Sequence, residues 1–513
     1  MLKKIKFIEF IYYFLIFVLF GISFYFSTEY AVYNTDFIHW SFILDQVNSF
    51  INGQNLYKDI FLQYGEGQVT LLTFINNFYK INIYSLGIIS SLIFGLKFFL
   101  IFKILTTIVS SRLLSFTCTF FIFISITYSQ IPWPDFYSGL CLLIFFYTLI
   151  VNDKDQNLYL IIFSSFLLFL SIYFRNTYLL NFILSIIVYF LYEIIFIKKK
   201  NLYIYKIFLI TTFFLIIYLI TLLSNDNLKL WFDQGFGLSN QYFGTGELEL
   251  INRIKKYFYY IARLIYHIVL PKNLVNLFFS LCILINLIYL LFSNLLIKKK
   301  LIENSSIKFI SIYGLCGLVQ LMSHYEILRY INASISIYLV SFYFIEKIDI
   351  ISKTKKFFFL IFFGLLYIIN IASFFPMSSH NHKTANFPIE TYNITNIKLF
   401  GKKKLSESYS KFYTDISQIT CDKDHIYNLS WDKTYNFLCN EAKNIYKYNV
   451  ILKNSDLLSR LQKGENLNNR IILSSEKLDN LEKIKELKLP KFFRYTKSDT
   501  YMRFYSDIVY IYK

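Results

Sequence analysis

The chain has 513 residues and a formal net charge of +19, and 56% of its residues are hydrophobic. Its mean hydropathy is +0.46, and many apolar runs reach the ~17–25 residues that cross a hydrocarbon core of ~30 Å. These values exclude a soluble globular protein. Much of the lysine excess lies beside the apolar runs and in the C-terminal part, so topology and contact with membrane lipids explain the charge, and nucleic acid is not an expected partner.

The first apolar run follows the basic start Met-Leu-Lys-Lys-Ile-Lys. It is longer than the apolar region of a signal peptide, and no small-residue cleavage site follows it, so we expect a retained first helix. The sequence predicts a polytopic α-helical membrane protein with about eleven transmembrane helices. Their expected ranges are 7–27, 82–104, 113–129, 136–151, 158–174, 178–197, 204–224, 273–297, 307–323, 331–345 and 357–375.

Lysine and arginine in short loops predict the orientation of these helices. The lysines before residue 7 place the N-terminus in the cytoplasm, and strict alternation then puts the runs 198–200, 298–300 and 347–356 on the same side. We therefore expect a multi-pass protein of the bacterial inner (plasma) membrane. The segments expected at the periplasmic face are 28–81, 130–135, 175–177, 225–272, 324–330 and the tail from residue 376.

The first of these outer loops, 28–81, is long and patterned. Asp36, His39, Trp40 and Ile43 recur at helical spacing, which predicts a short helix. A turn at Asn52-Gly53 and a second helix at 69–80 are expected to follow it. A later outer stretch, Leu250–Tyr266, is amphipathic and is expected to lie along the membrane interface.

The tail differs in composition from the rest of the chain. We divide the chain into a membrane domain, 1–375, and a small extracytoplasmic α/β domain, 376–513. The predicted strands are Ile426–Leu429, Tyr448–Leu452, Arg470–Leu473 and Ile508–Ile511, and the predicted helices are Trp431–Glu441, Ser455–Gln462 and Glu476–Leu487. Cys421 and Cys439 both lie in this tail and can pair as a disulfide, which would require an oxidising compartment.

Charged residues at the expected outer ends of helices are the candidates for chemistry. Asp36 and Asp135 lie close to the outer membrane surface, where carboxylates are costly to desolvate and often face a cavity or a partner. Helix capping is the simpler explanation of Asp36. Arg175 and Arg329 also lie on the outer side and can hold a phosphate through paired hydrogen bonds, although snorkelling to headgroups explains many such arginines. His324, Glu326 and Tyr330 accompany Arg329.

The first loop resembles that of the membrane-embedded glycosyltransferases of the GT-C class, which include protein O-mannosyltransferases and lipid A aminoarabinose transferases. The matching elements are Asp36, the helix around 39–50, the stretch from Gly53 to Asp59, and Tyr64-Gly65, with Asp135 in the second outer loop. The layout of about eleven spans followed by an outer domain is also similar. Many members carry two adjacent acids after the first helix, whereas Phe37 follows Asp36 here.

This resemblance implies an inverting transfer of a sugar from a polyprenyl-phosphate donor to an acceptor lipid, glycan or protein. Asp36 would be the general base and Asp135 the second catalytic acid. The residues expected to bind substrate are His39, Tyr57, Asp59, Tyr64, Glu66, Arg175, His324, Glu326, Arg329 and Tyr330. No His/Asp/Glu cluster has the spacing of a metal site, and the resemblance leaves dependence on a divalent cation open.

Two other functions remain open from the sequence. An O-antigen polymerase or ligase would use arginine and histidine in a large later loop, where Arg253, Arg263 and His267 lie. A flippase or transporter would show internal symmetry and polar breaks within its spans, and no clear duplication is present.

Overall fold

The structure is a computed structural model of the chain. It describes residues 10–21, 24, 37–126, 133–197, 201–237, 250–269, 274–296, 305–322, 332–347, 391–393, 404–423, 425–429, 444–447, 470–474, 477–478, 481–488 and 508–513.

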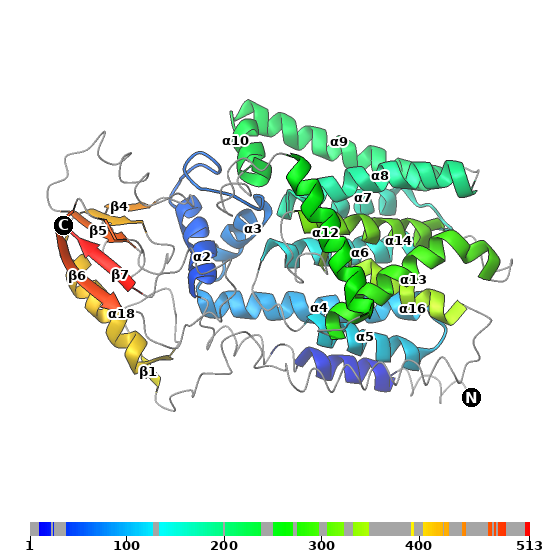
Figure 1. The fold of residues 1–513 in the computed structure, drawn as a ribbon, viewed down its shortest axis with the longest axis horizontal. Helices are drawn as coiled ribbons and strands as arrows, with labels where there is room; N and C mark the ends of the chain where they lie inside the picture. The colour runs from blue at the N-terminus through cyan, green and yellow to red at the C-terminus, as the bar shows by residue number, and fades with distance from the viewer. Residues whose placement is uncertain are drawn as a thin grey trace.

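Apolar helices form a bundle along the long axis of the molecule (Figure 1). They are the helix Phe10–Gly21, α4 (Ile83–Ile108), α5 (Arg112–Ile126), α6 (Pro134–Val151), α7 (Leu158–Phe174), α8 (Tyr178–Tyr192) with η1 (Glu193–Ile197), α9 (Leu202–Ser224), α13 (Leu274–Leu296), α14 (Ser305–Cys316) with η4 (Gly317–Met322), and α16 (Ile335–Lys347).

Four of the described helices are long and apolar enough to cross a membrane: Ser85–Ile108, Pro134–Val151, Tyr178–Phe196 and Leu202–Ser224. The described part of the chain is thus that of a helical membrane protein. Ten of the eleven predicted spans coincide with a described helix, and the eleventh, 357–375, lies outside the described residues. The number of spans and their orientation stay predictions.

Buried polar side chains join helices inside this apolar bundle. The side-chain amide of Asn286 on α13 donates to the hydroxyl of Ser341 on α16 at 2.9 Å, and the Ser311 hydroxyl of α14 donates to the Asn286 side-chain oxygen Oδ1 at 2.7 Å. Hydrogen bonds of this kind contribute to helix association where the surroundings are as apolar as lipid. They fix how three helices, distant in sequence from the first spans, pack together.

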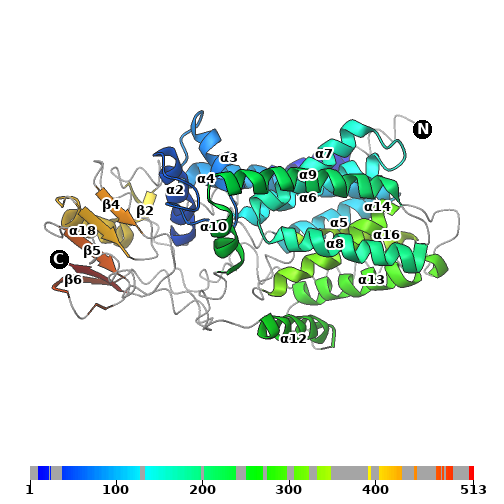
Figure 2. The same ribbon diagram turned by 90° about the horizontal axis from the view of Figure 1, so that it is seen from above.

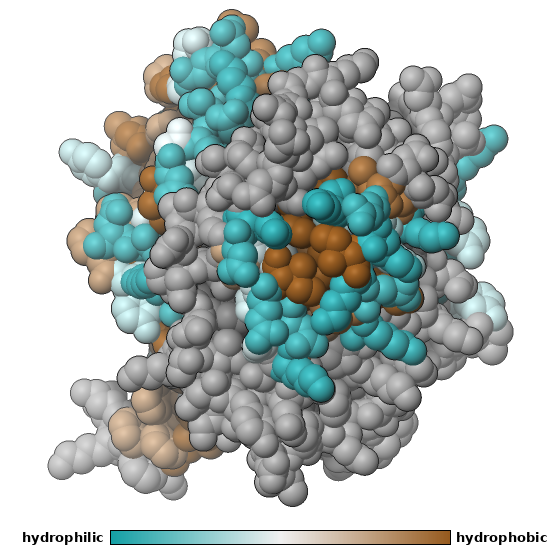
Figure 3. Space-filling model, turned by 90° about the vertical axis from the view of Figure 1, so that its left-hand side faces the viewer, coloured by the Kyte–Doolittle hydropathy of each residue, from teal (hydrophilic) through white to brown (hydrophobic). Residues whose placement is uncertain are grey.

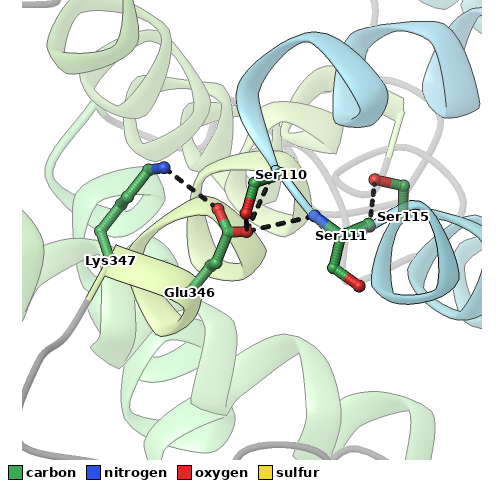
Figure 4. Close-up of polar contacts among 5 residues, drawn as sticks. All are labelled: Ser110, Ser111, Ser115, Glu346 and Lys347. Atoms are coloured by element: carbon green, nitrogen blue, oxygen red, sulfur yellow. Dashed lines mark hydrogen bonds and ion pairs between the residues drawn. The ribbon is translucent and has the colours of Figure 1, made fainter. Parts of the chain in front are cut away.

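A carboxylate also joins elements at the end of the bundle where α4 ends and α5 begins (Figure 4). Glu346 of α16 accepts hydrogen bonds from the backbone N–H of Ser110 at 2.7 Å and of Ser111 at 3.3 Å, and from the Ser110 hydroxyl. Lys347 Nζ lies 3.2 Å from the same carboxylate. An acid at a helix start satisfies free N–H groups, so Glu346 holds the start of α5 against α16.

The first loop forms a small layer between the bundle and the C-terminal sheet (Figures 1 and 2). It contains α2 (Phe37–Ile51) and α3 (Gly67–Asn76), close to the predicted helices. Gly53, in the expected turn between them, has a φ of +83°, a conformation that favours glycine. After α9 come two short elements, α10 (Leu228–Phe232) and η2 (Asp233–Gly237). The next described helix is α12 (Leu250–Val269).

The C-terminal part contains a five-stranded sheet in the order β4-β3-β5-β7-β6. Strands β4 (Asn444–Lys447), β3 (His425–Asn428) and β5 (Arg470–Ser474) are parallel, whereas β7 (Ile508–Tyr512) and β6 (Lys483–Lys488) pair in antiparallel fashion. Helix α18 (Glu407–Thr420) precedes β3, and β1 (Thr391–Asn393) pairs with β2 (Lys404–Ser406).

Three of the predicted strands match this sheet or nearly so, and one predicted helix is wrong. Strands β3, β5 and β7 lie where the sequence placed them, while β4 ends at Lys447, just before the predicted 448–452. The predicted helix Glu476–Leu487 overlaps β6, which is extended because it pairs with β7 at the far end of the chain. Local spacing does not reveal such a partner. The predicted helices 431–441 and 455–462 lie outside the described residues.

Both faces of the sheet carry buried apolar side chains, since neighbouring residues of a strand point to opposite sides and Tyr427, Ile472 and Tyr512 form a second cluster. Ile426, Ile471 and Ile511 share one buried cluster with α18 and with Ile43 and Val47 of α2. The C-terminal sheet and α2 therefore share apolar packing. From the end that carries this domain, hydrophobic side chains gather at the centre of the surface, ringed by hydrophilic ones (Figure 3).

Candidate functional site

A short link at one end of the bundle carries a buried arginine. Helix α7 ends at Phe174 and α8 begins at Tyr178, which confirms the tight link predicted at 175–177. Arg175 Nη1 lies 3.1 Å from Asp135 Oδ2, and its Nε donates to Thr177 Oγ1 at 3.2 Å. The arginine side chain is only 3% exposed. We call this end of the bundle, where α6 begins and α7 ends, the loop end.

Asp135 is held in place by its position in α6. Pro134 is the first residue of the helix, a position that suits the fixed φ of proline. Asp135 is the next residue and therefore lies in the first turn. A carboxylate there is favoured by the helix dipole, and its ion pair with Arg175 offsets the cost of its burial. Asp135 is 8% exposed. The structure therefore brings together two predicted residues that are 40 positions apart in the sequence.

Lys97 is a second cation at this end, and it was not among the residues predicted from the sequence. Its Nζ donates to Asn332 Oδ1 at 2.7 Å and lies 4.9 Å from the centre of the Phe136 ring. It is 1% exposed and interacts electrostatically with Asp135. A lysine inside an apolar run is itself a signal of a functional site, because burying its charge is costly.

The first loop covers the ion pair through Tyr64. The Arg175 guanidinium lies 4.5 Å from the centre of the Tyr64 ring, and Trp133 packs edge-on against the same ring at 5.2 Å. The Asn176 N–H donates to the Tyr64 carbonyl at 2.8 Å. A cation over an aromatic face is attracted to it, so Tyr64 both covers and orients Arg175.

Gly65 lets the loop approach the end of α7 closely. Its φ is +128°, and a Cβ at this position would lie 2.6 Å from the Tyr173 carbonyl oxygen. At Gly67, a Cβ would lie 2.7 Å from the Phe174 ring. The Tyr-Gly-Glu-Gly sequence is therefore required for backbone contact with the link that carries Arg175.

We expect Gly65→Ala to destabilise this contact by about 1–3 kcal/mol, because alanine is strained at this φ and collides with backbone atoms. Thermal unfolding of the purified protein should show a lower midpoint. Gly53→Ala is the matched control, since Gly53 has a φ of +83° and open space around its Cβ position. Equal losses in the two variants would show that the contact with α7 contributes nothing.

The preceding part of the loop is anchored by Gln234 of η2, a second residue that the sequence analysis missed. Its amide accepts from the Leu62 N–H at 2.9 Å and donates to the Tyr57 carbonyl at 2.8 Å. Tyr57 is 2% exposed, has a φ of +67°, and its hydroxyl lies 3.4 Å from that of Tyr218. Asp59 is exposed and accepts from the Asn55 N–H at 2.8 Å, which stabilises a turn.

Glu66 lies between the two glycines, immediately before α3. The Tyr173 hydroxyl donates to its Oε2 at 3.4 Å, and the same hydroxyl lies 3.3 Å from Thr70 Oγ1. Burial raises the pKa of the Glu66 carboxyl from its usual 4.5 to about 7, and hydrogen bonds from Tyr218 and Tyr173 partly oppose the rise. This carboxyl can therefore hold or release a proton near neutral pH.

The raised pKa of Glu66 predicts a pH-dependent stability. The folded protein holds this proton more tightly than the unfolded chain, so stability falls as the pH rises from about 4.5 through about 7. The loss should reach about 2 kcal/mol, after allowing for solvent around a half-buried group. Glu66→Gln should remove this pH-dependent loss of stability and should be more stable than the parent protein above pH 7. Thermal unfolding across this range tests the slope, and Asp59→Asn controls for charge. A Glu66→Gln protein with the parent's slope would contradict the assignment.

Several predicted residues lie outside the described part of the chain. They are Asp36, His324, Glu326, Arg329 and Tyr330. His39 belongs to α2, of which only the backbone is described at that position. Cys421 is disulfide-bonded, and Cys439 lies outside the described residues, so the identity of the pair stays a prediction. Among the residues described, no group of three or more His, Cys, Asp or Glu side chains could hold a metal ion.

Comparison with known proteins adds a structural likeness. No model of a known protein family matches the chain, and no curated protein matches it in sequence. Among solved structures, the chain is similar to ArnT from Cupriavidus metallidurans, a structure bound to undecaprenyl phosphate. The TM-score is 0.40 at 9% identity, over 98% of this chain and 97% of that chain.

Proposed function

We propose that the protein is an integral-membrane glycosyltransferase that moves a sugar from a polyprenyl-phosphate donor to an acceptor hydroxyl at the periplasmic face. One observation carries this proposal. Lys97 and Arg175 are buried beside a single described carboxylate, Asp135, at the end of the bundle covered by the patterned first loop. With both cations charged, these three groups sum to one positive charge, which an anionic ligand would neutralise.

A lipid phosphate fits this arrangement better than other anions. Its polyprenyl chain can lie against the apolar helices while its phosphate reaches the loop end, where Arg175 and Lys97 would supply hydrogen bonds and charge. Asp135 then serves to position Arg175, whose guanidinium it holds at 3.1 Å. Tyr64 of the first loop covers one face of the guanidinium.

The chemistry requires one base and one stabilised leaving group. The acceptor oxygen would attack the anomeric carbon of the sugar as its proton passes to Asp36, and the bond from that carbon to the phosphate oxygen would break. The phosphate leaves with the bonding electron pair, so it needs cations rather than an acid. A single displacement of this kind inverts the anomeric centre.

The disulfide at Cys421 supports the location of the tail. Disulfides persist in oxidising compartments such as the bacterial periplasm, and the described cysteines of the bundle, Cys118, Cys141, Cys282 and Cys316, are free. We propose that the C-terminal domain lies on the periplasmic side, with the loop end of the bundle.

Lipid binding tests the proposal directly. A polyprenyl phosphate should bind the purified protein more tightly than the same polyprenol without phosphate. Lys97→Met should weaken the affinity for the phosphate-bearing lipid by about 10–100-fold, the usual contribution of a hydrogen bond to a charged group. The affinity for the polyprenol should stay unchanged.

Lys103→Met is the matched control, because Lys103 lies on the same helix, nearer the opposite end. Unfolding midpoints of both variants separate lost binding from lost folding. Equal binding of the phosphorylated and unphosphorylated lipids by the parent protein would contradict the phosphate site. An unchanged affinity in folded Lys97→Met would remove Lys97 from it.

A further inference from the structure

Helix α12 lies along the side of the bundle and crosses the direction of its helices (Figures 1 and 2). Its 20 residues include four Lys or Arg residues and no acid. The basic residues are Arg253, Lys255, Lys256 and Arg263. A helix with this composition and a sharp division between polar and apolar faces is typical of one that lies in a membrane interface.

The side chains of α12 divide its surface into three strips. One strip packs on the bundle and contains the buried Leu264 with Tyr257 and Ile261. The next strip is apolar and exposed: Ile254 is 40% exposed, Phe258 63% and Ile265 58%. These three residues recur at helical spacing and fall on one line.

The third strip is polar and lies beyond the exposed apolar one. Lys255 and Arg263 are exposed on it and Lys256 is half-buried. Tyr259 and Tyr266 are exposed in the same sector. Tyrosine is enriched at the boundary between hydrocarbon and headgroups, so an apolar strip and a basic strip beside it match the two layers of a membrane surface.

The positive charge of α12 is unusual for a segment on the periplasmic side. The helix belongs to the connection after α9, in the segment 225–272 that the sequence places on the periplasmic side. Loops on that side normally carry few lysines and arginines. A basic strip without acids there is complementary to the phosphates of anionic phospholipids.

We propose that α12 binds anionic phospholipids of the outer leaflet. The strip of Ile254, Phe258 and Ile265 enters the acyl region, and Lys255, Lys256 and Arg263 bind the headgroup phosphates. This inference concerns a surface distinct from the ion pair of Arg175 and does not require the proposed sugar transfer.

The same helix is packed against an element that reaches the candidate site. Helix α12 contacts η4, and Gln320 of η4 donates to the Thr177 carbonyl at 3.0 Å. Thr177 in turn accepts from Arg175 Nε. Helix α12 is therefore joined through η4 to the link that carries Arg175.

Tryptophan quenching in nanodiscs tests the lipid preference without any activity measurement. The full chain with Phe258→Trp is reconstituted with equal fractions of brominated phosphatidylglycerol or brominated phosphatidylcholine, and the parent chain gives the background from its four tryptophans. We expect phosphatidylglycerol to be preferred by at least about fivefold, the contribution expected from one basic residue at a surface. The preference should weaken at high salt, which screens exposed charges.

The combined variant Lys255→Gln, Lys256→Gln, Arg263→Gln should abolish the preference. A control with the same loss of charge replaces Lys58, Lys80 and Lys229, which are exposed in the first loop and α10, and should retain it. Ile265→Trp provides a second reporter on the same strip. Equal quenching by the two lipids at both reporters, or a preference that survives the α12 variant, would overturn the proposal.

Discussion

Replacing Asp36 by asparagine is expected to reduce sugar transfer by about 10²–10⁴-fold, the usual contribution of a general base. Asparagine has nearly the same shape as aspartate and cannot accept the acceptor's proton. The loss should appear in kcat, while the affinity for the polyprenyl-phosphate donor stays close to that of the parent. The assay is transfer from a defined polyprenyl-phosphate sugar by the purified protein.

The helix that follows Asp36 makes this substitution a specific test. Helix α2 begins at Phe37, and its Gln46, ten positions after Asp36, donates to the Phe61 carbonyl at 2.6 Å, so this contact joins the helix to the rest of the first loop without using the substituted side chain. Asp226→Asn removes an exposed acid from the turn between α9 and α10, outside the expected binding residues, and should keep most of the transfer rate. Full activity of Asp36→Asn would eliminate the proposed base, even if the phosphate site is correct.

Replacing Asp135 by asparagine is expected to destabilise the protein by about 3–5 kcal/mol, the usual cost of removing one partner of a buried ion pair. Arg175 is 3% exposed and would remain charged, with Lys97 beside it and no carboxylate between them. Thermal unfolding should show a clearly lower midpoint. The double variant Asp135→Asn with Arg175→Gln should recover part of the loss, because no buried guanidinium is left unpaired.

The same variant links stability to ligand binding. A polyprenyl phosphate would supply the anion that Asp135→Asn lacks, so it should raise the unfolding midpoint of the variant more than that of the parent. Glu346→Gln at the opposite end of the bundle is the control, since it weakens a partly exposed contact between α16 and the start of α5, far from the loop end. A smaller rise in Asp135→Asn than in the parent would contradict an anion site between Lys97 and Arg175.

Features that depend on neighbours along the chain were predictable from the residues alone. Runs of apolar residues predict the helices because a span needs only length and hydrophobicity. The short link at 175–177, the helices α2 and α3, and the amphipathic stretch at α12 follow from local spacing for the same reason. Asp135 and Arg175 were singled out because they are charged residues at helix ends.

Which distant residues meet became known from the packing of the folded chain. Lys97 bonds to Asn332 across 235 positions, and Gln234 bonds to Leu62 across 172, and no periodicity joins such pairs. Strand β6 is extended because β7 pairs with it, although the sequence led us to expect a helix over these residues. A local pattern predicts which face of a helix a residue lies on and how near it is to the helix end. A site of opposite charges forms only where several helices bring their ends together. That arrangement depends on packing over the whole chain.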